Sequence, residues 1–355
     1  MKLLSLIYIA VVLTCLVGSP FVAAKTPLVF PAQSENKSVL KIYGGADKME
    51  IAPFLSAFQK KYPFVQIDYY ELSTFEVYSE FLADVKNPPD VLLSSAMNLQ
   101  VKLVNDGYAQ PYSSEQTNKL PAWAKWRNEV FGFTYETAVI AFNKEFLGEE
   151  VAPSSRNELL ELIRRRSEQI KGRIGIYDIT QVGIGYLLWA HDREQSSSYG
   201  RMLESFGYHS TRVFRRSADI LKALSTGELT VGYNILSSYA RTWAAQHPNI
   251  IVVQPKDYTS VIMRSAIIPK HAKNVIGAQL FIDYLVSVQG QTDMANFTNF
   301  EPINNEVRIK QKHLLDISEG QLRPVPLGIE ILVIDDQMKR QIIIQEWENA
   351  LFEYQ

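Results

Sequence analysis

The chain has 355 residues, and its 36 lysines and arginines nearly balance 38 aspartates and glutamates, which gives a formal net charge of −2 at pH 7. This balance argues against a protein that binds nucleic acid or a membrane surface. The length exceeds what a single hydrophobic core usually supports, so we expect two lobes.

The first 24 residues have the pattern of an export signal. Lys2 supplies a positive start, residues 3–17 form an almost unbroken apolar run, and Val22-Ala23-Ala24 places small side chains before Lys25. Such a run followed by a small-residue site is typical of a cleaved signal peptide. We therefore predict a mature chain that begins at Lys25 and is released into the periplasm.

The apolar run is too short for a retained transmembrane helix, which needs about 20 residues. Gly18 and Pro20 interrupt it before that length is reached. The only cysteine, Cys15, lies inside the run, and Thr14 before it fits a lipid-attachment site poorly. We therefore expect a mature chain without a lipid anchor, a disulfide bond or thiolate chemistry.

The first half of the mature chain alternates short apolar runs with amphipathic stretches. This alternation predicts strands at 39–43, 65–70 and 90–93, a helix that Asp47 caps and that runs to about residue 60, a helix at 76–85 capped by Ser73 and Thr74, and a further helix after Ser94 and Ser95. Strands that alternate with helices in this way favour a mainly parallel sheet covered by helices.

A second series of the same kind begins after Phe131. It predicts strands at 137–143 and 173–177 and helices at 155–170 and 183–190. The basic run Arg164-Arg165-Arg166 is interpreted as a solvated helix face. In open α/β sheets, ligands bind beyond the carboxyl ends of the strands, where helix N-termini offer N–H groups to anions. Two lobes of this kind can face one another across a cleft.

Several runs of the chain resemble type II periplasmic solute-binding proteins of ABC transporters. The resemblance rests on VLKIYGGADKMEIAPFLSAFQKKYP at 39–63, PDVLLSS at 89–95, GFTYETAVIAFN at 132–143, KGRIGIYD at 171–178, and the late helix 278–288 with VSVQG at 286–290. It implies a two-lobed α/β fold in which each lobe is a mainly parallel sheet flanked by helices and the ligand cleft lies between the lobes.

Within that family the chain is most similar to the ferric-binding-like branch, and there to the phosphoglycerate transport regulatory proteins. The run VGYNILSSYA at 231–240 carries this likeness. The iron-binding members have a tyrosine pair where this chain has Ser237 and Ser238, and a histidine near the position of Asp47. Tyr233 and Tyr239 lie nearby, so a ferric-ion carrier stays an alternative.

The resemblance also places an anion-binding loop in the second lobe. Val182 stands there in place of the serine that the family has. Phosphate binding at this loop would then depend on backbone amides or on Thr180.

The candidate ligand-binding residues follow predicted strands or open predicted helices. Each also has a simpler interpretation as a turn, a helix cap or a hinge residue. They are Gly45, Asp47, Ser73, Thr74, Ser94, Ser95, Thr134, Tyr135, Asp178, Thr180, Asn234, Ser237, Ser238 and Arg264.

Arg264 has two interpretations, because an arginine within the apolar run 261–268 is costly unless it is paired. Its partner is either a carboxylate of the same lobe or an acidic ligand. We favour the ligand, since guanidinium groups suit phosphates and carboxylates.

Sequence motifs of catalysis are absent. The chain contains no Gly-x-Ser-x-Gly elbow, no phosphate-cradling Walker loop, no His-Glu-x-x-His helix and no complete Gly-x-Gly-x-x-Gly; the nearest match, Gly183-Ile-Gly185, lacks the third glycine. We therefore expect a binding protein rather than an enzyme, with no cofactor and no resident metal. An exported enzyme stays the less favoured alternative.

The sequence thus predicts a periplasmic binding protein with crossover segments near 131–136 and 250–257. Lobe 1 is assigned residues 25–135 and 256–300, and lobe 2 residues 136–255 and 301–355. A small anionic solute, phosphorylated or carboxylated, would bind between the lobes, and hinge closure would follow. The expected partner is an inner-membrane ABC permease or a sensor histidine kinase, and the protein is expected to be a monomer that binds no nucleic acid.

Overall fold

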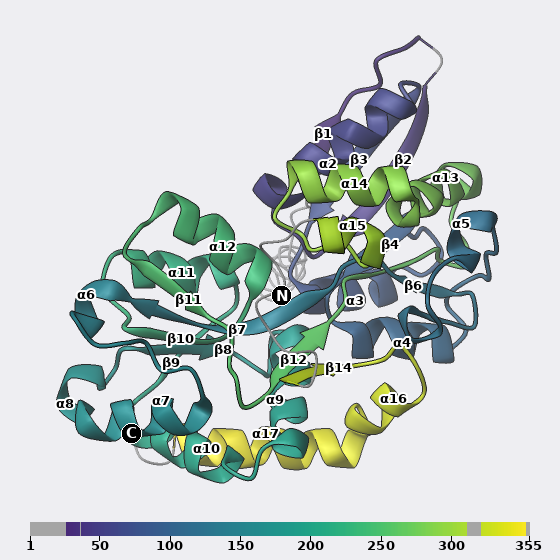
Figure 1. The fold of residues 1–355 in the computed structure, drawn as a ribbon. Coiled ribbons are helices and arrows are strands. Elements are labelled where there is room, and N and C mark those ends of the chain that lie inside the picture. The colour runs from purple at the N-terminus through teal and green to yellow at the C-terminus, as the bar shows by residue number, and fades with distance from the viewer. Residues whose placement is uncertain (1–25, 36, 311–320, 353–355) are drawn as a thin grey trace, which may run out of the picture.

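The structure is a computed structural model, and it describes residues 26–35, 37–310 and 321–352. The predicted signal peptide, with Cys15 in it, lies outside the described residues. The described chain forms two lobes, each built on a sheet of seven strands, with β7 at the junction between them (Figure 1). The predicted two-lobed α/β architecture is confirmed. No helix among the described residues is long and apolar enough to cross a bilayer.

The sheet of lobe 1 has the order β1-β3-β2-β4-β13-β6-β5. Its strands are β1 Leu28–Phe30, β2 Ser38–Gly44, β3 Val65–Glu71, β4 Val91–Ser94, β5 Lys125–Trp126, β6 Val130–Gly132 and β13 Ser265–Ile267. Its helices are α2 Lys48–Lys61, α3 Thr74–Ala83, α4 Met97–Asn105, α5 Glu115–Asn118, α13 Val275–Val286, α14 Val288–Phe297 and α15 Asn305–Lys310, with a 3-10 turn at Ala122–Ala124.

The sheet of lobe 2 has the order β14-β12-β7-β10-β8-β9, and β11 also pairs with β7. Its strands are β7 Glu136–Asn143, β8 Ile174–Tyr177, β9 Arg212–Phe214, β10 Val231–Leu236, β11 Ile250–Val253, β12 Thr259–Ile262 and β14 Leu322–Pro324. Its helices are α6 Lys144–Leu147, α7 Arg156–Arg165, α8 Ser167–Ile170, α9 Gly183–Gln195, α10 Tyr199–Tyr208, α11 Ser217–Ser225, α12 Ser237–Gln246, α16 Glu330–Ile334 and α17 Gln337–Phe352.

Strand burial follows the position of each strand in its sheet. In β3, Val65, Ile67 and Tyr69 are buried and alternate with partly exposed residues, as expected for a strand with one face on the core. Every residue of β4, β7 and β10 is buried, as in strands covered on both faces. This continuous burial fits the mainly apolar sequences of these strands, VLLS, ETAVIAFN and VGYNIL.

Both sheets are mixed, whereas the sequence predicted mainly parallel sheets. In lobe 1, β2 pairs in parallel with β3 and β4, but β13 lies antiparallel between β4 and β6. In lobe 2, β10 and β8 are parallel, but β7 runs antiparallel to β10, β11 and β12. The antiparallel strands β7 and β13 are the ones that enter each sheet after the chain crosses from the other lobe.

The second crossing lies later in the chain than predicted. The sequence analysis placed the return into lobe 1 at residue 256, but β12 pairs with β7 and β14 in the sheet of lobe 2. The chain therefore crosses between Ile262 and Ser265. The assignment of residues 301–355 to lobe 2 also needs correction, because α15 packs against α14 of lobe 1 and α16 packs against both α4 of lobe 1 and α9 of lobe 2.

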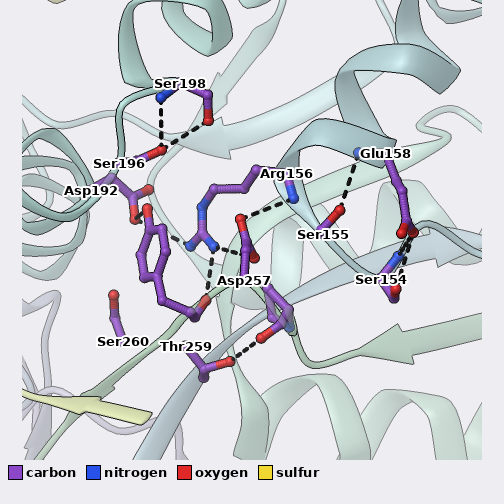
Figure 2. A network of polar contacts seen from close by, with 12 residues as sticks. Ser154, Ser155, Arg156, Glu158, Asp192, Ser196, Ser198, Asp257, Thr259 and Ser260 are labelled. Atoms are coloured by element: carbon purple, nitrogen blue, oxygen red, sulfur yellow. Dashed lines mark hydrogen bonds and ion pairs between the residues drawn. The ribbon is translucent and has the colours of Figure 1, made fainter. Parts of the chain in front are cut away.

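A buried polar network holds lobe 2 together around Arg156, which is only 1% exposed (Figure 2). Its Nε donates to the hydroxyl of Tyr233 at 2.6 Å, and Nη2 donates to Asp192 at 3.2 Å. Nη1 donates to Asp257 at 3.1 Å and to the carbonyl oxygen of Tyr258 at 2.8 Å. One guanidinium thus links α7, α9, β10 and the segment that leads into β12.

Asp192 is the carboxylate partner within this network, and it is 3% exposed. It accepts hydrogen bonds from the hydroxyls of Tyr233 and Tyr258 at 2.8 and 2.6 Å, and from the side-chain amide of Asn234 at 2.7 Å. A buried charge of this kind is tolerated because both partners are hydrogen-bonded, and removal of one partner leaves the other unpaired.

We therefore predict that Arg156→Met lowers the free energy of unfolding by about 3–5 kcal/mol, because Asp192 stays buried without its cation. Urea denaturation measures the change. Arg164→Met, on the exposed side of the same helix, is the matched control and should change stability by less than about 0.5 kcal/mol. Equal losses in the two variants would show that the network does not stabilise lobe 2.

Candidate functional site

A small cavity of about 40 Å³ lies between the two lobes. Its size leaves room for only a few water molecules, so the lobes are closed on one another. Both lobes contribute to its lining, which consists of Gly45, Asp47, Leu72, Ser73, Thr74, Ser95, Tyr177, Val182, Ile184, Arg215, Arg216, Ser217, Leu236 and Tyr239.

Contacts across the cleft support this closed arrangement. The backbone N–H of Asp47 in lobe 1 donates to the hydroxyl of Tyr239 in lobe 2 at 3.2 Å. Arg216 of lobe 2 forms an ion pair with Glu71 of lobe 1 at 3.4 Å. At Gly183, the first residue of α9, a side chain would come within 3 Å of lobe 1 atoms, so glycine permits this close approach.

The cavity lies where helices of both lobes begin. Asp47, Ser73 and Val182 are the N-cap residues of α2, α3 and α9. Arg216 and Leu236 are those of α11 and α12, and Ser95 directly precedes the N-cap of α4. Because the first N–H groups of a helix lack partners inside the helix and carry a partial positive charge, such a cavity favours an anion or polar oxygen atoms.

In lobe 1, side chains cover the ends of α2 and α3 but not that of α4, whereas in lobe 2 none of the three ends has a side-chain cap. In lobe 1, Glu71 accepts a hydrogen bond from the backbone N–H of Lys48 at the start of α2, and Ser73 forms a capping box with Glu76 at α3. The N-caps of α9, α11 and α12 in lobe 2 provide no side-chain acceptor. Outside the cavity lining, α7, α13 and α14 are each capped by a side chain, whereas α8, α10 and α16 are not.

Two arginines add positive charge to the lobe 2 side of the cavity. Arg215 and Arg216 form the turn between β9 and α11, and both are exposed. Arg216 pairs with Glu71, whereas Arg215 forms no ion pair with the described residues. This arrangement leaves Arg215 available to an anion that enters between the lobes.

Hydroxyl groups and a carboxylate line the lobe 1 side. Thr74 is 7% exposed, and its hydroxyl has no hydrogen-bond partner among the described residues. Ser95 is buried beside it at the start of α4. Burial raises the pKa of Asp47, and the negative charge of Glu71 raises it further, while Arg216 opposes both effects.

Two phenols line the cavity from lobe 2. The hydroxyl of Tyr177 shares a hydrogen bond of 2.6 Å with Ser217, and that of Tyr239 accepts from Asp47. Burial raises the pKa of Tyr177 to about 12, and it raises the pKa of Tyr239 as well. Both phenols are therefore neutral hydrogen-bonding groups near neutral pH.

Five of the predicted ligand-binding residues lie at the cavity. They are Gly45, Asp47, Ser73, Thr74 and Ser95. All five belong to the loops that follow β2, β3 and β4, where the sequence predicted strand ends facing helix N-termini. Their contact with a ligand stays a prediction.

Three other predicted residues are engaged within lobe 1 or at the junction. The hydroxyl of Ser94 accepts from the backbone N–H of Ala96, and that of Thr134 accepts from the backbone N–H of Arg264. The backbone of Tyr135 donates to Glu301, and its ring lies 4.0 Å from the guanidinium of Arg308. None of the three lines the cavity.

Three predicted residues of lobe 2 also bond within the protein. One carboxylate oxygen of Asp178 accepts from the backbone N–H and the hydroxyl of Thr180, at 3.0 and 2.6 Å. Asn234 has a positive φ of 60° and donates to Asp192 in the buried network. Tyr177, Val182 and Leu236, each within two positions of one of these residues, line the cavity, whereas Asp178, Thr180 and Asn234 do not.

The serine pair on α12 bonds to carboxylates of the protein rather than lining the cavity. Ser237 donates to Glu301 at 3.3 Å, and Ser238 donates to Glu136 at 2.7 Å. Both serines are fully buried. In this structure their hydroxyls bond to carboxylates at the start of α12, and their contact with a ligand stays a prediction.

Arg264 also has its partner inside the protein. Its Nε donates to Glu136 at 2.6 Å, and its guanidinium lies 4.5 Å from the ring of Phe300 and 5.4 Å from that of Tyr239. The structure shows a carboxylate as the partner of Nε, while Nη2 has no hydrogen-bond partner among the described residues. Contact between Arg264 and a ligand, which the sequence analysis favoured, stays a prediction. Glu136 lies 128 residues earlier in the chain, so spacing could not reveal the pair.

Sequence reasoning missed Arg215, Arg216 and Ser217. The preceding strand β9 has only three residues and was not predicted, so the basic pair did not appear at a strand end. The available signal was the run Phe214-Arg-Arg-Ser217 directly before the amphipathic stretch of α11.

Comparisons with known proteins identify the family and the fold. The family profile of bacterial extracellular solute-binding proteins matches residues 86–326. The solved substrate binding protein of an ABC transporter from Agrobacterium tumefaciens is 34% identical, with a TM-score of 0.86, and the match covers 91% of this chain and 98% of that chain. No curated protein matches the sequence.

Two further solved structures share the fold at lower identity. The periplasmic binding protein AfuA from Actinobacillus pleuropneumoniae, with exogenous fructose-6-phosphate bound, is 19% identical with a TM-score of 0.70, over 90% of this chain and 99% of that chain. Iron-bound HitA from Pseudomonas aeruginosa is 17% identical with a TM-score of 0.65, over 88% of this chain and 99% of that chain.

We predict that Arg264→Met lowers the free energy of unfolding of the ligand-free protein by about 3–5 kcal/mol, because it leaves the buried carboxylate of Glu136 unpaired. Adding Glu136→Gln should recover part of the loss, since the unpaired charge is then removed. Denaturation of the single and double variants measures both effects. A stable single variant with reduced ligand affinity would instead show that Arg264 binds the ligand.

A second prediction concerns Glu50, which is buried on α2. Burial raises its pKa from 4.5 to about 7, and the charges of Glu136 and Asp47 add to this, while Thr242 and Arg264 oppose it. Because the pKa of Glu50 is higher in the folded protein than in the unfolded chain, the protonated side chain favours the folded state. This contribution to stability is complete below pH 4.5, the unfolded pKa, and is lost as the pH rises through about 7.

Relative to Glu50→Gln, the wild type should therefore lose about 1–3 kcal/mol of unfolding free energy between pH 5 and pH 8. Chemical denaturation at both pH values measures this difference. Glu145→Gln, at an exposed position, is the control and should follow the wild-type profile. Parallel profiles for wild type and Glu50→Gln would contradict the assignment.

Proposed function

Because the chain belongs to the family of bacterial extracellular solute-binding proteins, we propose that it captures a small anionic solute, phosphorylated or carboxylated, between its lobes. One observation carries the proposal: the interlobe cavity combines Arg215 and Arg216 with the uncapped N-termini of three lobe 2 helices. Such N–H groups bind oxyanions well, and arginine adds charge-assisted hydrogen bonds.

Capture occurs by closure of the lobes around the solute, and the solute-bound form holds the lobes further apart than this structure, whose cavity of about 40 Å³ is smaller than such a solute. In the open form the solute enters and meets the helix ends of one lobe. Closure then brings the other lobe into contact and forms the pairs Arg216–Glu71 and Asp47–Tyr239 across the cleft. A ligand that contacts both lobes shifts the equilibrium toward the closed form, which differs in shape from the open form and can be recognised by a membrane partner.

The partner is an inner-membrane ABC permease, to which the protein delivers its solute in the periplasm. The likeness to the Agrobacterium tumefaciens substrate binding protein of an ABC transporter supports this assignment. A sensor histidine kinase is the second candidate, supported by the resemblance of residues 231–240 to the phosphoglycerate transport regulatory proteins. The solute in that case regulates a two-component system.

An organic phosphate and a carboxylate both fit the cavity's chemistry. The structure of AfuA with fructose-6-phosphate shows that a protein of this fold accommodates a sugar phosphate. Its identity to this chain is 19%, so it supports the class of ligand and not a particular compound.

A ferric ion is the second candidate solute, because Asp47, Tyr177 and Tyr239 place oxygen atoms at the cavity. In this structure the hydroxyl of Tyr177 bonds to Ser217 and that of Tyr239 to the backbone N–H of Asp47, so ferric ion would have to displace both partners. Among the described residues, no group of three histidine, cysteine or carboxylate side chains is arranged to hold a metal ion.

We predict that an organic anion of this class stabilises the protein against heat, by about 2.7 kcal/mol at a hundredfold excess over its Kd. Thermal unfolding with fructose 6-phosphate, gluconate and ferric citrate compares the candidates, with fructose and citrate as controls. Binding is then measured by calorimetry. Tight ferric binding without a response to any organic anion would contradict the proposal.

A further inference from the structure

The two sides of the cavity carry opposite chemistry. We propose that lobe 2 holds the anionic end of the solute and that lobe 1 recognises hydroxyl groups on the rest of it, with Asp47 as the specificity-determining residue. The solute is then a hydroxylated phosphate or carboxylate rather than a bare anion. This inference rests on the proposed function and adds the orientation of the solute.

Lobe 2 has the features that an anion requires. Arg215 and Arg216 lie at the start of α11, and the N-caps of α9, α11 and α12 contribute no side-chain acceptor. Val182 and Leu236, which are two of these N-caps, have apolar side chains that cannot accept a hydrogen bond. Two arginines and helix N-termini without side-chain caps therefore occur together on this side, and Asp219 in the first turn of α11 is the one carboxylate among these first turns.

In lobe 1, carboxylates of the protein already accept backbone hydrogen bonds at the N-termini of two helices. Glu71 accepts from the backbone N–H of Lys48 at 3.0 Å, at the start of α2. Glu76 accepts from the backbone N–H of Ser73 at 2.7 Å, and the hydroxyl of Ser73 accepts from the N–H of Glu76 at 3.2 Å, at the start of α3. A ligand anion placed at either end would meet like charge, so these ends are unsuited to it.

The remaining lobe 1 groups are suited to hydroxyls. Asp47 is the N-cap of α2, but its side chain makes no capping hydrogen bond. The hydroxyl of Thr74, on a residue that is 7% exposed, has no partner among the described residues. A carboxylate accepts from a ligand hydroxyl, and a threonine hydroxyl both donates and accepts. Together with buried Ser95, they form a site for the polyol part of a solute.

Matched pairs of six-carbon probes test this division. Fructose 6-phosphate is compared with n-hexyl phosphate, and gluconate with hexanoate, by calorimetry on the full mature protein. In whichever pair binds to the wild type, the hydroxylated compound should have a Kd at least about tenfold lower than that of its partner without hydroxyl groups. The reason is that only the hydroxylated compound can donate hydrogen bonds to Asp47. 6-Aminohexanoate tests whether an ammonium group is preferred to hydroxyls.

Asp47→Asn should reduce this preference by about tenfold and leave the affinity for n-hexyl phosphate or hexanoate within about threefold of wild type. The double variant Arg215→Gln/Arg216→Gln should weaken both members of a pair alike, by about tenfold or more. Asp84→Asn in lobe 1 and Arg212→Gln in lobe 2, at exposed positions outside the cavity, are the matched controls. Thermal unfolding of each variant verifies the fold.

The outcomes separate this inference from the proposed function. If wild type binds none of the four anions, both are wrong. If it binds them but Asp47→Asn weakens both members of a pair equally, or if 6-aminohexanoate binds more tightly than gluconate, only the division between the lobes is overturned. A double arginine variant that changes the preference for hydroxyls and not the affinity for anions would also overturn it.

Discussion

The buried ion pair between Arg264 and Glu136 joins the two segments on which the arrangement of the lobes depends. Glu136 opens β7, the strand that carries the chain into lobe 2, and Arg264 lies where the chain returns to lobe 1 after β12. The backbone N–H of Arg264 also donates to Thr134, and Ser238 at the start of α12 bonds to Glu136. Since α12 begins at the cavity, the position of the binding groups follows from this junction.

The chemistry of the cavity follows from how each lobe satisfies its helix ends. In lobe 1, the carboxylates of Glu71 and Glu76 accept hydrogen bonds at the N-termini of two helices. In lobe 2, three helix N-termini have no side-chain cap, and Arg215 and Arg216 add positive charge. The ion pair Arg216–Glu71 spans the cleft and is partly exposed, so it contributes less to closure than a ligand that contacts both sides. A solute that carries both an anion and hydroxyl groups satisfies both lobes at once.

Much of the fold follows from local patterns, but the use of each polar side chain does not. Runs such as 39–43 and 65–70 either alternate apolar with polar residues or are largely apolar, so the strands that they form could be predicted. Within one loop, however, Ser73 caps α3, while Thr74 lines the cavity with a hydroxyl that has no partner in the described part of the chain. The partner of Arg264 comes from a distant strand. Such assignments depend on tertiary contacts that residue spacing does not contain.

The small molecules that co-purify with the exported protein test the central claim most directly. Untargeted mass spectrometry of these molecules, together with intact native mass of the complex, identifies the solute without a choice of probe. The account predicts one bound organic phosphate or carboxylate with several hydroxyl groups. A ferric ion without an organic anion, or a neutral sugar as the bound species, would contradict it.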